Sequence, residues 1–125
     1  MHRCVLLLAA LACLPASAQS TRHFPTNTLR GEIVVGSAPP VIALNGRPSQ
    51  FAPAARIYDQ NNQLHLSGYY VGQKLIVNYT HDLLGQPLMV WILTPDERAN
   101  RPWPRSDAEA RSWSFNAAAQ TWSKP

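Results

Sequence analysis

The pattern of apolar and polar positions predicts a series of short β-strands between residues 29 and 94. Lys74–Thr80 has an apolar residue at every second position, as expected of a strand with one buried face. Leu88–Leu93 is apolar at consecutive positions, which is typical of a strand covered on both faces. The other expected strands cover residues 30–35, 41–44, 55–58 and 64–67.

Turn residues separate these strands and predict how they connect. Asn45-Gly46 is the strongest hairpin signal, because both residues tolerate a positive φ. Pro48 follows immediately and predicts a short or edge strand on the return. About six short strands without a helix between them predict a mainly β domain over residues 29–94. We expect a small antiparallel barrel of OB-like or SH3-like size, because closure hides the edges of short strands.

The sequence pattern changes after Thr94. The new pattern predicts a short, partly helical or disordered tail over residues 95–125. Thr94 and Glu97 have the spacing of a capping box, and Pro95 stands at the first helical position. The same signature at Ser106 predicts a second helix that runs to about Gln120. Two alternatives are open for the large apolar residues of the tail: they dock onto the barrel or form an exposed interaction surface. These residues are Trp103, Trp113 and Trp122.

The first residues predict a secretory signal peptide over Met1–Ala18. A basic start precedes the apolar run Cys4–Leu14, and small residues at Ala16 and Ala18 favour cleavage before Gln19. The chain would then be periplasmic or secreted, with residues 19–28 as a flexible lead-in. A lipoprotein acylated at Cys13 is the competing interpretation. No run of about 20 apolar residues predicts a transmembrane segment.

Cleavage at this position changes the chemistry that the chain can use. Both cysteines, Cys4 and Cys13, would be lost, and with them disulfides, thiol catalysis and cysteine-based zinc sites. The formal net charge of +4 would fall to +3 with the loss of Arg3. The remaining basic residues are spread along the chain, whereas nucleic-acid binders concentrate them on one face or run. We therefore expect no nucleic-acid partner.

Several short motifs in one order carry a resemblance to known proteins. They are Leu44-Asn45-Gly46, Ala52-Pro53 through Arg56-Ile57, Asp59-Gln60-Asn61-Asn62, Gly72-Gln73, Val77-Asn78-Tyr79-Thr80 and Val90 through Glu97. On these residues the chain resembles a group of small uncharacterised exported, periplasmic proteins of Gram-negative β-proteobacteria. The resemblance implies a compartment and a compact β-domain, and it implies no activity.

Polar and aromatic residues at predicted turns are the candidate binding residues. The run Asp59–Asn62 could bind a sugar or a peptide backbone, or it could cap its own turn. Tyr69 and Tyr70 are adjacent, so one ring is expected on each face of a strand. The full candidate set is Asp59, Gln60, Asn61, Asn62, Tyr69, Tyr70, Trp103 and Trp113. These residues predict a non-catalytic interaction module that binds an envelope protein or a cell-wall component.

Histidines give the alternative function, a small-ligand or metal-binding protein. His65, His81 and Asp59 would form the site if their loops met at one end of the barrel, since imidazole and carboxylate suit zinc or copper(II). No spacing typical of a metal site supports this set, and we expect no cofactor. No sequence motif supports a catalytic serine triad, because the chain has no G-x-S-x-G elbow. We therefore do not expect an enzyme.

Overall fold

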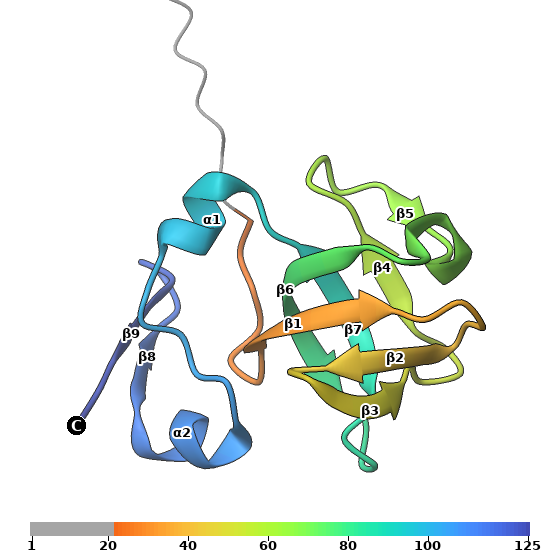
Figure 1. The fold of residues 1–125 in the computed structure, drawn as a ribbon. Helices are drawn as coiled ribbons and strands as arrows, with labels where there is room; N and C mark the ends of the chain where they lie inside the picture. Colours follow the sequence, from red (N-terminus) through yellow and green to blue (C-terminus); the bar gives the residue numbers. More distant parts are fainter. Residues whose placement is uncertain (1–21) are drawn as a thin grey trace, which may run out of the picture.

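The computed structural model describes residues 22–125 (Figure 1). The predicted signal peptide and the alternative anchor Cys13 lie outside the described residues. Within residues 22–125 the structure contains no helix with the length and apolar character needed to cross a membrane.

The fold is mainly β, as predicted, and is built on one seven-stranded sheet. In spatial order its strands are β3 (Arg47–Gln50), β2 (Val41–Leu44), β1 (Leu29–Val35), β6 (Lys74–His81), β7 (Pro87–Ile92), β4 (Arg56–Tyr58) and β5 (Leu64–His65). The pair β4–β7 is parallel, so the sheet is mixed and the prediction of a wholly antiparallel arrangement was wrong. Among the described residues no pairing joins β3 to β5, and closure into an OB-like or SH3-like barrel stays a prediction.

The parallel pair follows from the path of the chain between β4 and β7. The chain turns back from β4 into β5, forms the 3₁₀ helix η1 (Ser67–Tyr70), and then enters β6. The β6–β7 hairpin brings β7 alongside β4 with Ile57 opposite Val90. This route places η1 and the β4–β5 turn at the same end of the sheet (Figure 1).

The turn signals at Asn45 and Gly46 form the predicted hairpin between β2 and β3. Their φ angles are 52° and 80°, the left-handed region that both residues tolerate. Pro48 lies in β3, which is an edge strand as expected from its missing N–H. A second glycine constraint lies in β1, where a Cβ on Gly31 would come within 2.8 Å of the Tyr79 ring.

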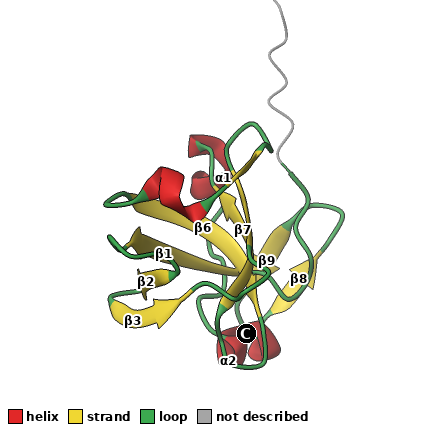
Figure 2. Cartoon of the chain, turned by 90° about the vertical axis from the view of Figure 1, so that its right-hand side faces the viewer, coloured by secondary structure: helices red, strands yellow, loops and turns green. Residues whose placement is uncertain are grey.

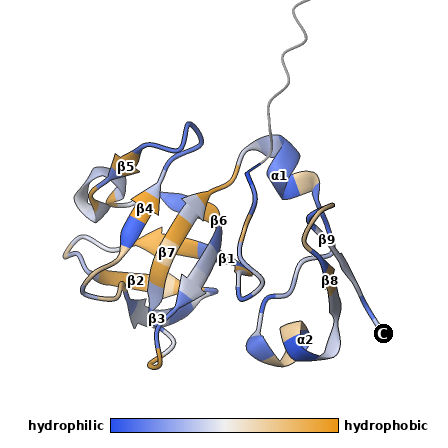
Figure 3. Cartoon of the chain, turned by 180° about the vertical axis from the view of Figure 1, so that it is seen from behind, coloured by the Kyte–Doolittle hydropathy of each residue, from blue (hydrophilic) through white to orange (hydrophobic). Residues whose placement is uncertain are grey.

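The two faces of the sheet bury two different hydrophobic clusters. Alternate residues of β6, namely Leu75, Val77 and Tyr79, face the first cluster together with Ile33 of β1 and Val90 of β7. The opposite face contributes Ile76 of β6 and Trp91 of β7 to a second cluster. Figure 3 shows that β7 is hydrophobic along much of its length; its Val90 and Ile92 pack in the first cluster with Ile57 of β4. Trp91, on the opposite face of β7, is partly buried against the second cluster.

The tail lies beside the sheet (Figures 1 and 2) and packs against part of its second face, at Ile76 and Trp91. It contains α1 (Pro95–Ala99), α2 (Asp107–Ser112) and a hairpin of β8 (Ser114–Asn116) and β9 (Thr121–Ser123). The capping box at Thr94 and Glu97 is confirmed. The prediction that the second helix reaches Gln120 was wrong, because α2 ends at Ser112 and the residues before Gln120 form the hairpin turn.

Tail tryptophans are part of this second cluster, so the docking alternative holds for Trp103 and Trp122. Each is 5% exposed, and the Trp103 Nε1–H donates to the Thr28 carbonyl at 3.0 Å. Trp113 packs against the cluster and is partly buried. Trp103 and Trp122 therefore offer no exposed tryptophan surface, because they are buried in the second cluster together with Phe24 and Leu93.

The described part of the predicted lead-in, residues 22–28, also packs against the tail. Phe24 is 6% exposed, and its N–H donates to the Gln120 side-chain oxygen at 2.8 Å. Arg22 forms an ion pair with Glu97 at 2.7 Å. These contacts connect the start of the domain to its end.

Candidate functional site

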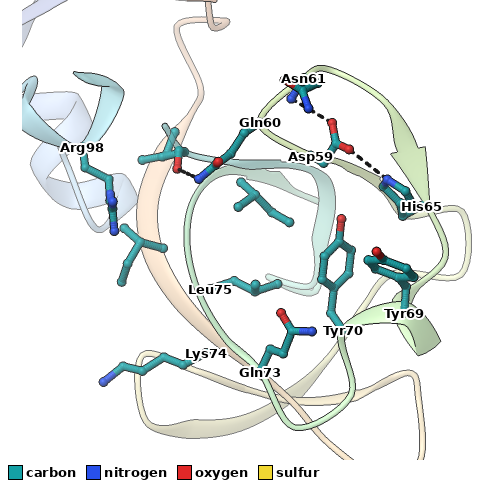
Figure 4. Close-up of a pocket in the computed structure, with 13 residues that line it drawn as sticks. Asp59, Gln60, Asn61, His65, Tyr69, Tyr70, Gln73, Lys74, Leu75 and Arg98 are labelled. Atoms are coloured by element: carbon teal, nitrogen blue, oxygen red, sulfur yellow. Dashed lines mark hydrogen bonds and ion pairs between the residues drawn. The ribbon is translucent and has the colours of Figure 1, made fainter. Parts of the chain in front are cut away.

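A cavity of about 410 Å³ opens at the end of the sheet where η1 and the β4–β5 turn meet (Figure 4). Its walls come from the turn residues 59–61, His65 of β5, η1, the first residues of β6, the last residues of β7, and Arg98 of α1. We call this cavity the η1 pocket. It brings together Asp59, Gln60, Asn61, Tyr69 and Tyr70, which the sequence marked as candidates in two separate motifs.

Asp59 organises one wall of the η1 pocket. Its Oδ1 accepts hydrogen bonds from the backbone N–H groups of Asn61 and Gln63, both at 2.9 Å. Its Oδ2 lies 2.9 Å from His65 Nε2. The hydrogen bond from Gln63, with those from His65 and Asn61, holds the pKa of Asp59 below its ordinary value. The structure thus confirms that the turn caps itself, and it leaves a charged carboxylate at the pocket.

The 3₁₀ helix η1 sets the two tyrosines at right angles to each other. Tyr69 is 67% exposed and stacks on His65, with ring centroids 4.7 Å apart at 21°. Tyr70 is 5% exposed and meets the edge of Tyr69 at 5.1 Å and 82°. One ring is exposed and one buried, as predicted, although a 3₁₀ helix produces this arrangement instead of a strand.

The Tyr70 hydroxyl is a buried polar group without a partner. No described residue forms a hydrogen bond with its Oη. Figure 4 shows this hydroxyl directed into the space between Gln60 and the Asp59–His65 pair. Burial raises the pKa of Tyr70, and the nearby charge of Asp59 raises it further. The hydroxyl therefore keeps its proton and is a hydrogen-bond donor that lacks an acceptor in the described chain.

Gln60 and Asn62 have different roles in the turn. The Gln60 Nε2 donates to the Leu93 carbonyl at 2.9 Å, which fixes the turn to the end of β7. Asn62 has a φ of 63° and shapes the turn, but it does not line the η1 pocket. Of the predicted run Asp59–Asn62, the first three residues face the cavity.

The far side of the η1 pocket carries positive charge that the sequence motifs did not indicate. Lys74 begins β6 and Arg98 belongs to α1, and both line the cavity with Gln73 between η1 and β6. The Lys74 side chain is 64% exposed and lies 3.5 Å from Glu32. Only the route of β6 and the docking of α1 bring these residues here, so no local pattern could have identified them.

The structure does not bring the predicted metal ligands together. Asp59 and His65 are paired, but His81 lies at the opposite end of β6 from Lys74. Seven residues of strand separate these two ends by roughly 23 Å. No group of three or more histidine, cysteine, aspartate or glutamate side chains in residues 22–125 is arranged to hold a metal ion.

His81 instead closes a contact between the sheet and the tail. Its Nδ1 lies 2.6 Å from the Asp82 carbonyl oxygen, and its Nε2 lies 2.8 Å from Asp107 of α2. The hydrogen bond to Asp82, together with the bond to Asp107, raises the pKa of His81.

The two tryptophans among the predicted binding residues lie away from the η1 pocket. Trp103 and Trp113 line a second cavity formed by the tail. The prediction grouped them with Tyr69 and Tyr70, whereas the fold places the two pairs in different cavities.

The η1 pocket therefore combines an exposed aromatic face, a carboxylate, amide groups and a buried hydroxyl. Such a cavity, with a few placed polar groups beside aromatic side chains, is typical of a small-ligand site. Comparison of the chain with protein-family models, curated proteins and solved structures finds no match.

Proposed function

We propose that this protein is an exported, non-catalytic interaction module that binds a cell-wall glycan in the η1 pocket. The signal peptide predicted over Met1–Ala18 and the resemblance to exported proteins support a periplasmic or secreted location. The observation that carries the binding proposal is the buried, unpartnered hydroxyl of Tyr70 at the pocket.

An unpaired buried hydroxyl is unfavourable for the free protein. Leaving a buried donor without an acceptor costs about 1 to 3 kcal/mol. The Tyr70 Oη is covered in the free protein, so a ligand oxygen reaches it only by displacing the side chains above it. A ligand oxygen that then accepts from Tyr70 Oη would remove this cost, so binding gains from a group that folding leaves unsatisfied. A ligand rich in hydroxyl and amide groups offers such acceptor oxygens.

The neighbouring side chains favour a sugar as the ligand. The exposed Tyr69 ring offers a flat apolar face, and the stacked His65 ring supports it from behind. The Asp59 carboxylate and the Asn61 amide provide acceptors and donors for sugar hydroxyl and acetamido groups. Lys74 and Arg98 would face carboxylate groups that cell-wall glycans carry on their peptides or lactyl ethers.

An envelope protein is the other partner class that the sequence predicts. A specific protein interface buries about 800 Å² on each partner. The candidate residues here surround a concave cavity of about 410 Å³, a size in the range of small-ligand sites. We therefore favour the glycan.

Calorimetric titration of the purified protein with soluble peptidoglycan fragments tests this proposal. We expect saturable binding that weakens about tenfold in Tyr69→Ala, the loss of about 1.4 kcal/mol expected for one aromatic contact. Leu84→Ala is the matched control, since Leu84 is an exposed apolar residue outside the η1 pocket. Absence of saturable binding, or equal weakening in the control, would contradict the proposal.

A further inference from the structure

A second cavity of about 470 Å³ lies between the tail and Arg30 of β1, and it has a different chemistry from the η1 pocket. Its walls combine four cationic side chains with two aromatic ones. These residues are Arg30, Arg101, Arg105, Lys124, Trp103 and Trp113. Glu109 is the one carboxylate that lines the same cavity. We call it the tail cavity.

Neutral oxygen atoms accept the hydrogen bonds of two of these cations, Arg30 and Arg105. The Arg30 guanidinium donates to the Asn78 side-chain oxygen at 3.0 Å and to the Asn100 carbonyl at 2.8 Å. It also donates to the carbonyls of Glu97 at 3.2 Å and Arg98 at 3.5 Å, so most of its N–H groups are already used. Arg105 donates to the Asn45 side-chain oxygen at 3.0 Å. Within residues 22–125 none of the four cations forms a salt bridge, since the ion pairs found there involve other residues. The guanidinium groups are therefore positioned without being neutralised.

The tryptophans hold two of the cations against flat surfaces. The Arg30 guanidinium carbon lies 5.1 Å from the centre of the Trp103 ring. The Lys124 ammonium lies 5.3 Å from the Trp113 ring. Such contacts favour a fixed position for a cation but do not cancel its charge.

Arg30 shows the electrostatic consequence of this arrangement. Burial lowers its pKa to about 10, Glu97 opposes the shift, and the like charge of Arg101 contributes to it. An anion placed between these guanidinium groups would relieve the repulsion that Arg101 exerts on Arg30.

We infer that the tail cavity binds a phosphate group. Four cations and one carboxylate leave an excess of three positive charges around the cavity. A phosphate monoester carries about −1.5 to −2 charges at pH 7, which matches this excess better than a single carboxylate does. The exposed guanidinium forks of Arg101 and Arg105 can bind phosphate oxygens in pairs, while Arg30 contributes its positive charge. This site lies on other elements than the η1 pocket and does not depend on the proposed glycan function.

Two sources supply this chemistry, a soluble phosphorylated sugar and the headgroup of a phospholipid. The first measurement uses inorganic phosphate, which contains the shared group alone, and follows the indole N–H signals of Trp103 and Trp113 by NMR at constant ionic strength. We expect saturable shifts at both signals. They should weaken by about tenfold in the double variant Arg101→Gln, Arg105→Gln, the loss of about 1.4 kcal/mol expected for charge-assisted hydrogen bonds.

The double variant Arg47→Gln, Arg56→Gln is the matched control, because it also removes two positive charges, from β3 and β4 outside the tail cavity. Unchanged affinity in this control supports a specific site. No saturable shift with phosphate, or an equal loss in the control, would overturn the inference.

Two further arms identify the source of the phosphate. Titration with glucose 6-phosphate tests a soluble sugar, and co-sedimentation with phosphatidic acid vesicles, against phosphatidylcholine vesicles, tests a lipid. Binding in either arm that the double variant loses supports the inference and assigns the source. If the wild type binds neither glucose 6-phosphate nor phosphatidic acid vesicles more strongly than the double variant does, the result would contradict a physiological phosphate ligand.

Discussion

Burial of Tyr70 has two opposing effects on stability: the ring gains packing contacts, and the hydroxyl loses its hydrogen bonds. The ring belongs to the first hydrophobic cluster, whereas the hydroxyl on the same ring has no partner in the described chain. Removal of the hydroxyl alone should therefore affect stability and binding in opposite directions.

We predict that Tyr70→Phe keeps or increases the free energy of unfolding, by up to about 1 kcal/mol, because it removes an unsatisfied buried donor. The same variant should bind peptidoglycan fragments more weakly than the wild type. Urea unfolding and calorimetry measure the two effects. Tyr69→Phe serves as the control, since the Tyr69 hydroxyl is on an exposed ring. A clear loss of stability in Tyr70→Phe would show that the hydroxyl has a partner in the free protein.

His81 provides a second prediction, because its raised pKa depends partly on Asp107. We expect Asp107→Asn to lower the pKa of His81, with Asp96→Asn as a control on an exposed carboxylate. Since the folded pKa lies above the ordinary value, the stabilisation is complete at pH values below that ordinary value. It is lost as the pH rises through the folded pKa. NMR titration of the ring protons measures the shift, and an unchanged pKa in Asp107→Asn would contradict the assigned contact.

Among the elements, α1 is short, and its main effect is to place Glu97. The Thr94 N–H donates to Glu97 Oε1 at 3.0 Å, and Arg22 donates to both carboxylate oxygens. Burial alone would raise the pKa of Glu97, but the hydrogen bonds from Arg22 and Thr94 outweigh it and lower the pKa. Arg22 also donates to the carbonyls of Asp59 and Ile92, which connects α1 to the η1 pocket.

We predict that Glu97→Gln lowers the free energy of unfolding by about 3 kcal/mol near neutral pH, because it leaves Arg22 without its counter-charge. Because the pKa of Glu97 is lowered in the folded state, Glu97 stabilises the fold fully at pH values above its ordinary pKa. This stabilisation is lost as the pH falls through the pKa of Glu97 in the folded state. The wild type and the variant should therefore converge in acid. Chemical unfolding at several pH values measures this, and a difference that persists in strong acid would contradict the ion-pair explanation.

Local sequence patterns predicted elements well where a short motif determines the backbone. Asn45-Gly46 and the Thr94–Glu97 capping box formed as expected, because their geometry depends on residues close in sequence. The end of α2 was mispredicted, because the alanines after Phe115 favour a helix while Phe115 and Trp122 pair across a hairpin to cover the sheet. The parallel pairing of β4 with β7 had no local signal, since it depends on the whole path through η1 and β6.

At the scale of the whole molecule, one sheet separates two cores that different parts of the chain complete. The first core is formed mainly by the sheet strands, with Phe51 and Tyr70 added from outside them. The second core joins Ile76 and Trp91 of the sheet to Trp103 and Trp122 of the tail. Because the second core contains residues from both parts, the tail and the sheet should unfold together.

We predict that Trp122→Ala lowers the free energy of unfolding by about 3 to 5 kcal/mol. Far-ultraviolet circular dichroism and tryptophan fluorescence should report one coincident transition in the wild type and in the variant. Leu83→Ala is the control, because Leu83 is a fully exposed apolar residue. Two separate transitions would show that the tail is an independent unit.

The candidate site also emerges only at this scale. The sequence identified Asp59–Asn62 and Tyr69-Tyr70 separately, and the fold joins them through the 3₁₀ helix and the β4–β5 turn. Lys74 and Arg98 complete the η1 pocket from β6 and α1, which no spacing in the sequence brings together. The predicted metal site grouped His81 with His65, although the fold separates them. Residue type alone does not indicate at which end of a strand a histidine lies.

Mapping of amide chemical shifts during titration with peptidoglycan fragments tests the glycan proposal most directly, because it reports on every part of the chain at once. We predict that the largest saturable changes lie at Asp59, Asn61, His65, Tyr69 and Tyr70, with small changes in the tail. Changes confined to the tail, or no saturable change at residues 59–70, would contradict a glycan site in the η1 pocket.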